Sequence, residues 1–304
     1  MQPSAEPTAH SRGVVDRLVI GLVIGAVAVS VGAVALLTVY MNRIGDAAAG
    51  LRRVDPLGAY EGRPSPVGAD GVHALNYLLM TTDARGELDA VLVAHLSASR
   101  RDLTLVTLPA DLLVDDGRTT LAENYAIEPR LAARSVEALT NARMDHQLHL
   151  DVTGFPAVVD SLGGLRLGHD RLGGEQALAY LDAAADPTER SVRTAELLRG
   201  ALAASTMSSA IADPNRFDKV LDALTPCLTV DADLTADLIE ATMVESRVHA
   251  EEIATWPLAV ARGADGAHAD PVGLTHLRRA LAADDLAGAG SRQAVWQASP
   301  APKR

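Results

Sequence analysis

The sequence predicts one α/β or α+β domain, a central mixed sheet flanked by helices, that follows a single membrane-spanning helix. Residues 18–40 carry no charged side chain. Between residues 70 and 285, short apolar runs typical of buried strands are interleaved with segments of helical periodicity. Hydrophobic residues make up 48% and charged residues 22% of the 304 positions, which is typical of a globular chain.

The uncharged segment 18–40 is long enough to cross a bilayer. As a helix it spans about 35 Å, against a hydrocarbon core of about 30 Å. A cleavable signal peptide cut near Ala47–Ala49 is the alternative, but signal sequences have apolar cores of only about 7–15 residues. We therefore expect a retained anchor, with residues 1–17 as a cytoplasmic tail. The flanking arginines do not decide the orientation, because long domains translocate largely regardless of charge.

Residues 41–69 are rich in proline and glycine and predict a linker between the membrane and the domain. The apolar run Leu75–Met80 predicts a buried strand. Two further apolar runs, Val91–Leu96 and Leu103–Leu108, are joined by a short polar segment and predict a hairpin. Residues 144–152 predict another strand.

Helical spacing and end signals predict the helices. Thr153 is the expected N-cap of a helix that runs to Leu162 and stops at two glycines. Asp186 followed by Pro187 predicts the start of a long helix that ends near Ser205. The remaining predicted helices are 131–139, 174–181, 214–224, 234–245 and 271–282. The Gly/Ala/Ser/Pro-rich residues 286–304 are expected to form a disordered tail.

Composition excludes several classes of function. The chain has 39 acidic and 27 basic residues, a formal charge of −12, and no basic run that would attract a phosphate backbone. Aromatic residues make up 3%, too few to build a stacking platform for single-stranded nucleic acid. We therefore expect no nucleic-acid partner. Cys227 is the only cysteine, so an intramolecular disulfide and a multi-thiolate metal site are excluded.

Three groups of polar residues are candidates for chemistry. Asp83, Glu87 and Asp89 follow a strand and could bind Mg²⁺, or they could form a solvated turn whose carboxylates cap backbone amides. Asp145, His149 and Asp151 share one face of a strand, as a metal site or, more simply, as its solvent side. His95 lies in an apolar run and is expected to be a hydrogen-bonded histidine in or near the core.

Several motifs in fixed order resemble the LytR-CpsA-Psr (LCP) family, also called cell-envelope-related transcriptional attenuators. The likeness covers about residues 70–285. The segments that carry it are Asp83-Ala84-Arg85, Leu108-Pro109-Ala110-Asp111, Asn124-Tyr125-Ala126, Asp151-Val152-Thr153-Gly154-Phe155, Asp160-Ser161-Leu162-Gly163-Gly164, Gly174–Tyr180 and Arg190-x-x-Arg193.

The resemblance implies a single-pass membrane protein whose domain faces the cell wall. Its implied activity is Mg²⁺-dependent transfer of a glycopolymer from a polyprenyl-pyrophosphate carrier to peptidoglycan. The implied partners are the lipid-linked glycan, peptidoglycan, the membrane and other LCP proteins. By the same resemblance Asp83 and Asp89 are metal ligands, and Arg85, Arg190 and Arg193 face the phosphates. Arginine forks and a divalent cation are what a pyrophosphate requires, and the lipid tail requires an apolar groove.

The sequence departs from the family pattern at four positions where an arginine is usual: Glu87, Ala110, Asp182 and Ala184. Four positive charges thereby become two negative ones, and Thr194 stands where a glutamine is usual. Two hypotheses follow. In one, the protein is a phosphotransferase whose pyrophosphate is held by other arginines, such as Arg118 or Arg171. In the other, it is a non-catalytic scaffold that binds a lipid, a glycan or an active relative. Direct transcriptional control is disfavoured by the acidic balance and the membrane span.

Overall fold

The computed structural model describes residues 42–66, 68–69, 72–205, 214–249 and 252–288. The chain forms two compact units, residues 1–46 and residues 47–304, and the following description concerns the second. The predicted membrane span 18–40 and most of the predicted tail lie outside the described residues. Within the described ranges, no helix has both the length and the apolar character needed to cross a bilayer.

A seven-stranded mixed sheet forms the middle layer, in the order β1-β12-β9-β4-β5-β6-β13. Its strands are β1 (Arg52–Val54), β4 (Leu75–Thr82), β5 (Leu88–Leu96), β6 (Leu103–Pro109), β9 (His146–Asp151), β12 (Leu228–Asp231) and β13 (Ile253–Pro257). The pairs β4–β5, β5–β6 and β9–β12 are antiparallel, whereas β1–β12, β4–β9 and β6–β13 are parallel. The predicted mixed α/β sheet and its hairpin are confirmed.

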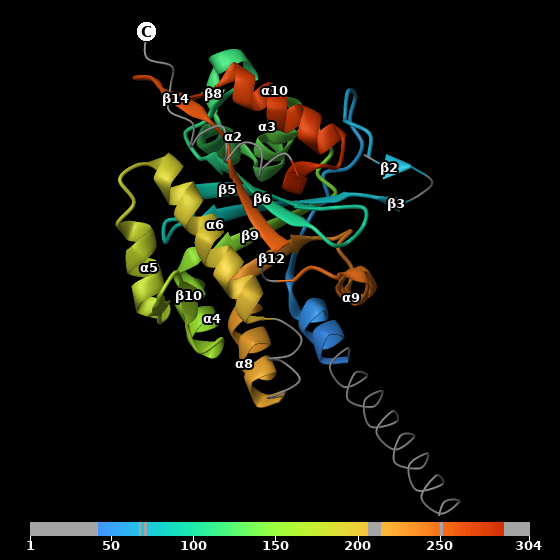
Figure 1. The fold of residues 1–304 in the computed structure, drawn as a ribbon, viewed down its shortest axis with the longest axis vertical. Helices are drawn as coiled ribbons and strands as arrows, with labels where there is room; N and C mark the ends of the chain where they lie inside the picture. Colours follow the sequence, from blue (N-terminus) through green and yellow to red (C-terminus); the bar gives the residue numbers. More distant parts are fainter. Residues whose placement is uncertain (1–41, 67, 70–71, 206–213, 250–251, 289–304) are drawn as a thin grey trace, which may run out of the picture. The chain divides into compact units, whose positions relative to one another are not determined.

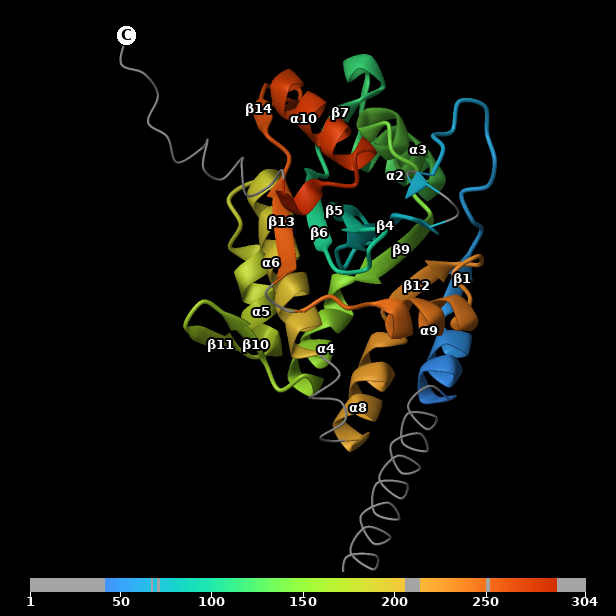
Figure 2. The same ribbon diagram turned by 45° about the vertical axis from the view of Figure 1, so that its right-hand side comes forward.

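Helices cover both faces of this sheet (Figures 1 and 2). One face packs against α2 (Leu121–Ile127), α3 (Pro129–Thr140) and α10 (Pro271–Ala282), around buried side chains such as Leu78, Met80 and Leu277. The other packs against α4 (Phe155–Ser161), α5 (Gly174–Asp182), α6 (Pro187–Ala204) and α8 (Pro214–Leu224), around Leu92, Leu105 and Leu197. Because the central strands are buried on both faces, their sequences are almost continuously apolar.

The remaining elements lie outside these layers. They are helix α9 (Ala236–Glu245), the short 3-10 turns η1 (Asp115–Gly117) and η2 (Val152–Gly154), and four two-stranded pairs: β2 (Gly68–Ala69) with β3 (Val72–His73), β7 (Leu113–Val114) with β8 (Thr119–Thr120), β10 (Leu165–Leu167) with β11 (Asp170–Leu172), and β14 (Val260–Arg262) with β15 (Ala267–Ala269).

The ends of several elements differ from the sequence prediction. Thr153 does not cap α4: its backbone N–H donates to the side chain of Asp151, which starts the turn η2, and α4 begins at Phe155. β1, which joins the sheet edge, lies within the residues predicted as a linker. Leu286, in the predicted tail, is buried in the core next to α10.

Candidate functional site

The arginines and acids of the resemblance lie at one end of the sheet. β4 ends at Thr82, β5 begins at Leu88, and the turn between them carries Asp83 and Arg85. Helices α5 and α6 meet at the same end, where α5 ends at Asp182 and α6 begins at Pro187. The Asp186 carboxylate caps α6 by accepting the N–H groups of Thr188 and Glu189. These bonds outweigh burial and lower the pKa of Asp186.

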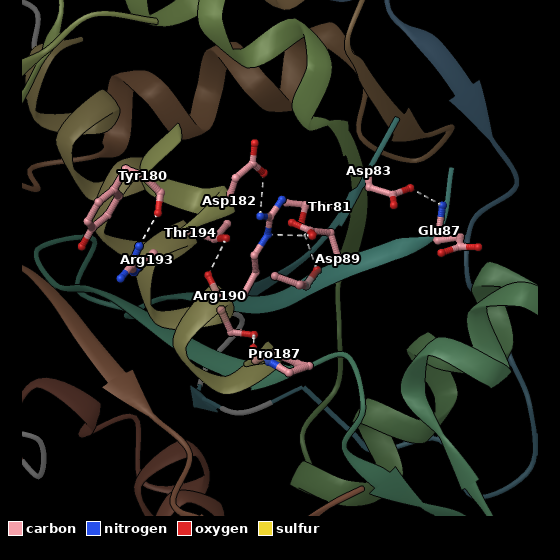
Figure 3. Close-up of polar contacts among 12 residues, drawn as sticks. Thr81, Asp83, Glu87, Asp89, Tyr180, Asp182, Pro187, Arg190, Arg193 and Thr194 are labelled. Carbon is pink, nitrogen blue, oxygen red and sulfur yellow. Dashed lines mark hydrogen bonds and ion pairs between the residues drawn. The ribbon is translucent and has the colours of Figure 1, made fainter. Parts of the chain in front are cut away.

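Arg190 forms the centre of this cluster (Figure 3). Its Nε lies 2.7 Å from Asp89 Oδ1, and its Nη1 donates to Asp182 Oδ1 at 2.9 Å. The Arg190 and Asp89 side chains are 17% and 12% exposed, whereas Asp182 is 63% exposed. Burial lowers the pKa of Arg190, but the two carboxylates outweigh it, so the net shift is upward. The guanidinium is therefore charged and already engaged by two acids.

Arg85 is paired within its own turn. Asp83 Oδ1 accepts the N–H groups of Arg85 and Glu87, and Asp83 Oδ2 lies 3.1 Å from Arg85 Nη2. The same nitrogen lies 2.7 Å from Glu87 Oε2. Burial raises the pKa of Asp83, but these hydrogen bonds dominate and lower it overall. The turn predicted as the alternative to a metal site is therefore present, and the Arg85 side chain is 74% exposed.

Arg193 forms an ion pair within α6 and a hydrogen bond to α5. Its Nη2 lies 2.6 Å from Glu189 Oε1, and its Nη1 donates to the Tyr180 carbonyl. The guanidinium carbon also lies 4.6 Å above the centroid of the Tyr180 ring. In Figure 3, Arg193 points toward Tyr180 while Arg190 points toward Asp89. The structure thus brings Arg190 and Asp89 together, whereas Arg85 and Arg193 each belong to a separate local pair.

The two arginines suggested as substitutes contact other groups. Arg118 donates from Nε to the Asp115 carbonyl at 2.8 Å, and its side chain is 75% exposed. Arg171, on β11, donates to the Gly163 carbonyl at 2.6 Å. Both contacts hold local turns. No contact in the described part of the chain joins either arginine to Asp83 or Asp89.

A second arginine bridge, which the sequence did not indicate, lies beside the first. Arg262 of β14 pairs with Asp111, which follows β6, and with Asp186 at 3.3 Å. It also donates to Thr188 Oγ1 at 2.7 Å. The bond to Asp111 is the largest cause of a raised pKa at Arg262. Arg262 thus links the first turn of α6 to the residue that follows β6, although Arg262 belongs to none of the motifs that resemble the family.

An apolar pocket adjoins the cluster. Its cavity volume is about 20 Å³, room for a water-sized group, and it opens toward solvent. Its walls come from β4, β9, η2, α4, α5 and α6 through Leu79, Thr81, Leu150, Val152, Phe155, Leu181, Thr194, Leu197 and Leu198. Leu181 directly precedes Asp182, and the Thr194 hydroxyl donates to the Arg190 carbonyl. The pocket is therefore lined in part by α5 and α6, the two helices that the Arg190–Asp182 pair joins.

The histidines and carboxylates elsewhere are also placed. His95 is buried as predicted, with Nδ1 2.7 Å from Asn76 Oδ1 and Nε2 2.9 Å from Asp284 Oδ1. His149 contacts the Tyr125 hydroxyl, and burial lowers the pKa of His149 to about 4. Asp145 and Asp151 accept backbone N–H groups instead of meeting His149. Among the described residues, no group of three or more His, Cys, Asp or Glu gathers as a metal would require.

Comparison with known proteins identifies the fold. Residues 63–167 match the LytR_cpsA_psr family model. TagV from B. subtilis is similar in structure, with a TM-score of 0.57 and 18% identity, over 71% of this chain and 98% of that chain. The LytR-Csp2A-Psr enzyme from Actinomyces oris matches with a TM-score of 0.57 and 19% identity, over 75% and 95% of the two chains. TagT bound to LI-WTA matches with a TM-score of 0.56 and 18% identity, over 75% of this chain and 99% of that chain.

A search of curated proteins gave no match. The solved structures are too distant in sequence to indicate more than a shared fold, but the family match rests on the sequence of this chain. The resemblance that the motifs indicated is therefore confirmed over residues 63–167, which match the LytR_cpsA_psr family model.

Proposed function

We propose that this chain is a membrane-anchored protein of cell-envelope assembly that binds a polyprenyl-linked glycopolymer and transfers it poorly or not at all. The observation that carries the proposal is the apolar pocket beside Arg190. Its lining is apolar and lies near a mostly buried cation, so it would suit an amphipathic ligand with a lipid chain and an anionic head once the cavity, about 20 Å³ in this structure, widens to admit the chain. The family match and the fold shared with TagT bound to LI-WTA support a glycopolymer as the rest of that ligand.

The charge balance supports impaired transfer. Each of the three arginines that resemble the family clamp already pairs with one or two carboxylates of this chain. Of these pairs, only Arg190 with Asp89 is mostly buried and therefore costly to separate, whereas the exposed pairs are weakened by solvent. A pyrophosphate would compete with these acids, most strongly with Asp89, and the four positions without arginine supply no compensating attraction. The same pairing favours the second candidate, a scaffold that binds a lipid, a glycan or an active LCP relative without turnover.

A magnesium ion belongs to the proposal, and Asp89 is the residue that fits it best. Asp89 Oδ2 is buried and has no hydrogen-bond partner among the described residues, so it is available to a hard cation. Mg²⁺ is commonly held by only one or two carboxylates together with substrate phosphates and water. Asp83 would be the second ligand, after turning from Arg85. When bound, the ion would neutralise charge on the phosphates, while Arg190 would orient them.

The location of the domain is also part of the proposal. The uncharged residues 18–40 would form the anchor and place the domain on the outer side of the cell membrane, next to peptidoglycan. Residues 52–66 come after the anchor in the sequence and are part of the domain. In this segment β1 pairs with β12, and Arg63 pairs with the buried Glu137 at 3.1 Å.

Restoring positive charge tests the proposed ligand. Glu87→Arg together with Asp182→Arg should tighten binding of a polyprenyl pyrophosphate and make it more salt-sensitive, since exposed ion pairs are screened. Both positions are exposed, whereas Ala110 is 7% exposed in the core and is left unchanged. The matched control is Asp116→Arg with Glu175→Arg, which makes the same change in net charge at other exposed positions. Equal gains in both double variants would contradict a ligand at this site.

A further inference from the structure

The two carboxylates that hold Arg190 differ in burial. Asp89 and Arg190 form the inner pair, with side chains only 12% and 17% exposed. Asp182 approaches from solvent and is 63% exposed. In Figure 3, Asp89 and Asp182 reach different sides of the guanidinium. Removing Asp89 would leave a mostly buried cation without its inner partner, whereas Asp182 can return to water at little cost. Asp182 is therefore the exchangeable partner of Arg190.

The position of Asp182 on its helix also favours exchange. It is the last residue of α5, where the helix dipole presents partial negative charge. No basic residue lies in the last turn of α5 to offset a carboxylate there. The described contacts of the Asp182 carboxylate are its ion pair and hydrogen bond with Arg190. The pair with Arg190 of α6 therefore holds Asp182 at the end of α5, where the helix dipole disfavours a carboxylate.

The contact also lies where a ligand head would arrive. Leu181 and Thr194 line the apolar pocket. Leu181 directly precedes Asp182 on α5, and Thr194 follows Arg190 by one turn of α6. Because Asp182 is the more exposed of the two partners, an anionic group that arrives from solvent would reach Arg190 from the side that Asp182 occupies. Its oxygen would replace Asp182 Oδ1 on Nη1, and the charge on Arg190 would remain balanced.

We propose that Asp182 is an internal competitor that occupies Arg190 in place of an anionic ligand, so that binding at this site requires its displacement. The inference rests on the proposed function for the identity of the ligand, but the competition concerns only side chains of this chain. Position 182 therefore affects binding in two ways. It lacks an arginine that would attract a phosphate, and its carboxylate occupies the Arg190 nitrogen that a phosphate oxygen would contact.

Inorganic pyrophosphate is the probe, titrated calorimetrically into the purified full chain in detergent with EDTA present, so that no metal contributes. Asp182→Asn keeps the size of the side chain and removes its charge. It should lower the dissociation constant about tenfold, as expected when a ligand regains one charge-assisted hydrogen bond. Glu175→Gln, on the exposed first turn of the same helix, removes the same charge and should change binding less than twofold. Asp182→Ala serves as a second variant.

Arg190→Gln in the Asp182→Asn background should abolish the gain. Equal gains for Asp182→Asn and Glu175→Gln would show a general charge effect and overturn the inference, as would a gain that survives Arg190→Gln or no gain in either Asp182 variant. These outcomes are separable from failure of the proposed function, because the pyrophosphate probe carries neither lipid nor glycan. A tighter pyrophosphate site in a chain that ignores polyprenyl pyrophosphate would leave the competitor in place and remove the proposed ligand.

Discussion

At the scale of single residues, Asp83 and Asp89 differ in what they can offer a cation. Both oxygens of Asp83 accept hydrogen bonds within its own turn. One oxygen of Asp89 pairs with Arg190, and the other is buried and has no hydrogen-bond partner within the described part of the chain. A buried carboxylate oxygen without a partner is costly, and a bound cation would satisfy it. Asp89 is therefore the stronger metal candidate, although the motif alone made the two aspartates equivalent.

Titration with Mn²⁺ tests this assignment. The wild-type chain should show one weak site, detected by the loss of the free Mn²⁺ electron paramagnetic resonance signal. Asp89→Asn should remove the site, and Asp83→Ala should weaken it. Asp116→Asn, whose side chain is 99% exposed, is the control and should bind as the wild type does. Identical curves for the wild type, Asp83→Ala and Asp89→Asn would mean that both aspartates serve only the turn and the arginine pair.

At the scale of elements, the sequence predicted best the helices with an explicit start signal. Asp186-Pro187 begins α6 as predicted, and the predicted helix 271–282 begins at Pro271 behind Asp270, which caps it. The prediction was wrong at the start of α4, because the Asp151 carboxylate captures the N–H of Thr153 and forms a 3-10 turn first. The edge strands β1 and β13 were missed because their short sequences, RRV and IATWP, carry no alternation strong enough to predict a strand.

The site was only partly predictable for a related reason. The motifs placed Asp89 and Arg190 on separate elements, and the fold brings them to 2.7 Å. The pairing of Asp182 with Arg190 depends on how the end of α5 meets the start of α6, which no local pattern specifies. Arg262 belongs to a two-stranded pair far along the chain, and only tertiary structure brings it to Asp111.

The close contact between α4 and α5 gives a prediction at this scale. A Cβ at Gly174, the first residue of α5, would lie 2.3 Å from the carbonyl oxygen of Pro156. Backbone cannot yield as a side chain does, so Gly174→Ala should destabilise the domain by about 1–3 kcal/mol. Gly200→Ala on α6 meets only ordinary contacts and should be neutral or stabilise by up to about 1 kcal/mol. Urea unfolding of both variants measures the difference. Equal midpoints would contradict the packing described for α4 and α5.

At the scale of the whole molecule, the proposed topology places residues 41–304 outside the cytoplasm. Glu61→Cys puts a thiol on an exposed position after the anchor, and the native Cys227 is 7% exposed, which keeps background labelling low. An impermeant thiol reagent should label this cysteine on intact cells with a permeabilised wall. Ser11→Cys, before the anchor, should react only after lysis. Labelling of Glu61→Cys only after lysis would place the domain inside.

The central claim is that a domain with the LCP fold has kept that fold, while the arginines that would bind phosphate are paired with its own acids. Removal of one preorganised donor can cost about 10²–10³ in rate, so four missing arginines leave little capacity for transfer. The most direct measurement is turnover of a polyprenyl-pyrophosphate-linked glycan with Mg²⁺ by the full chain, beside an LCP protein that carries all four arginines. We predict a rate lower by at least about 10²-fold. Rates within about tenfold of each other would contradict the account.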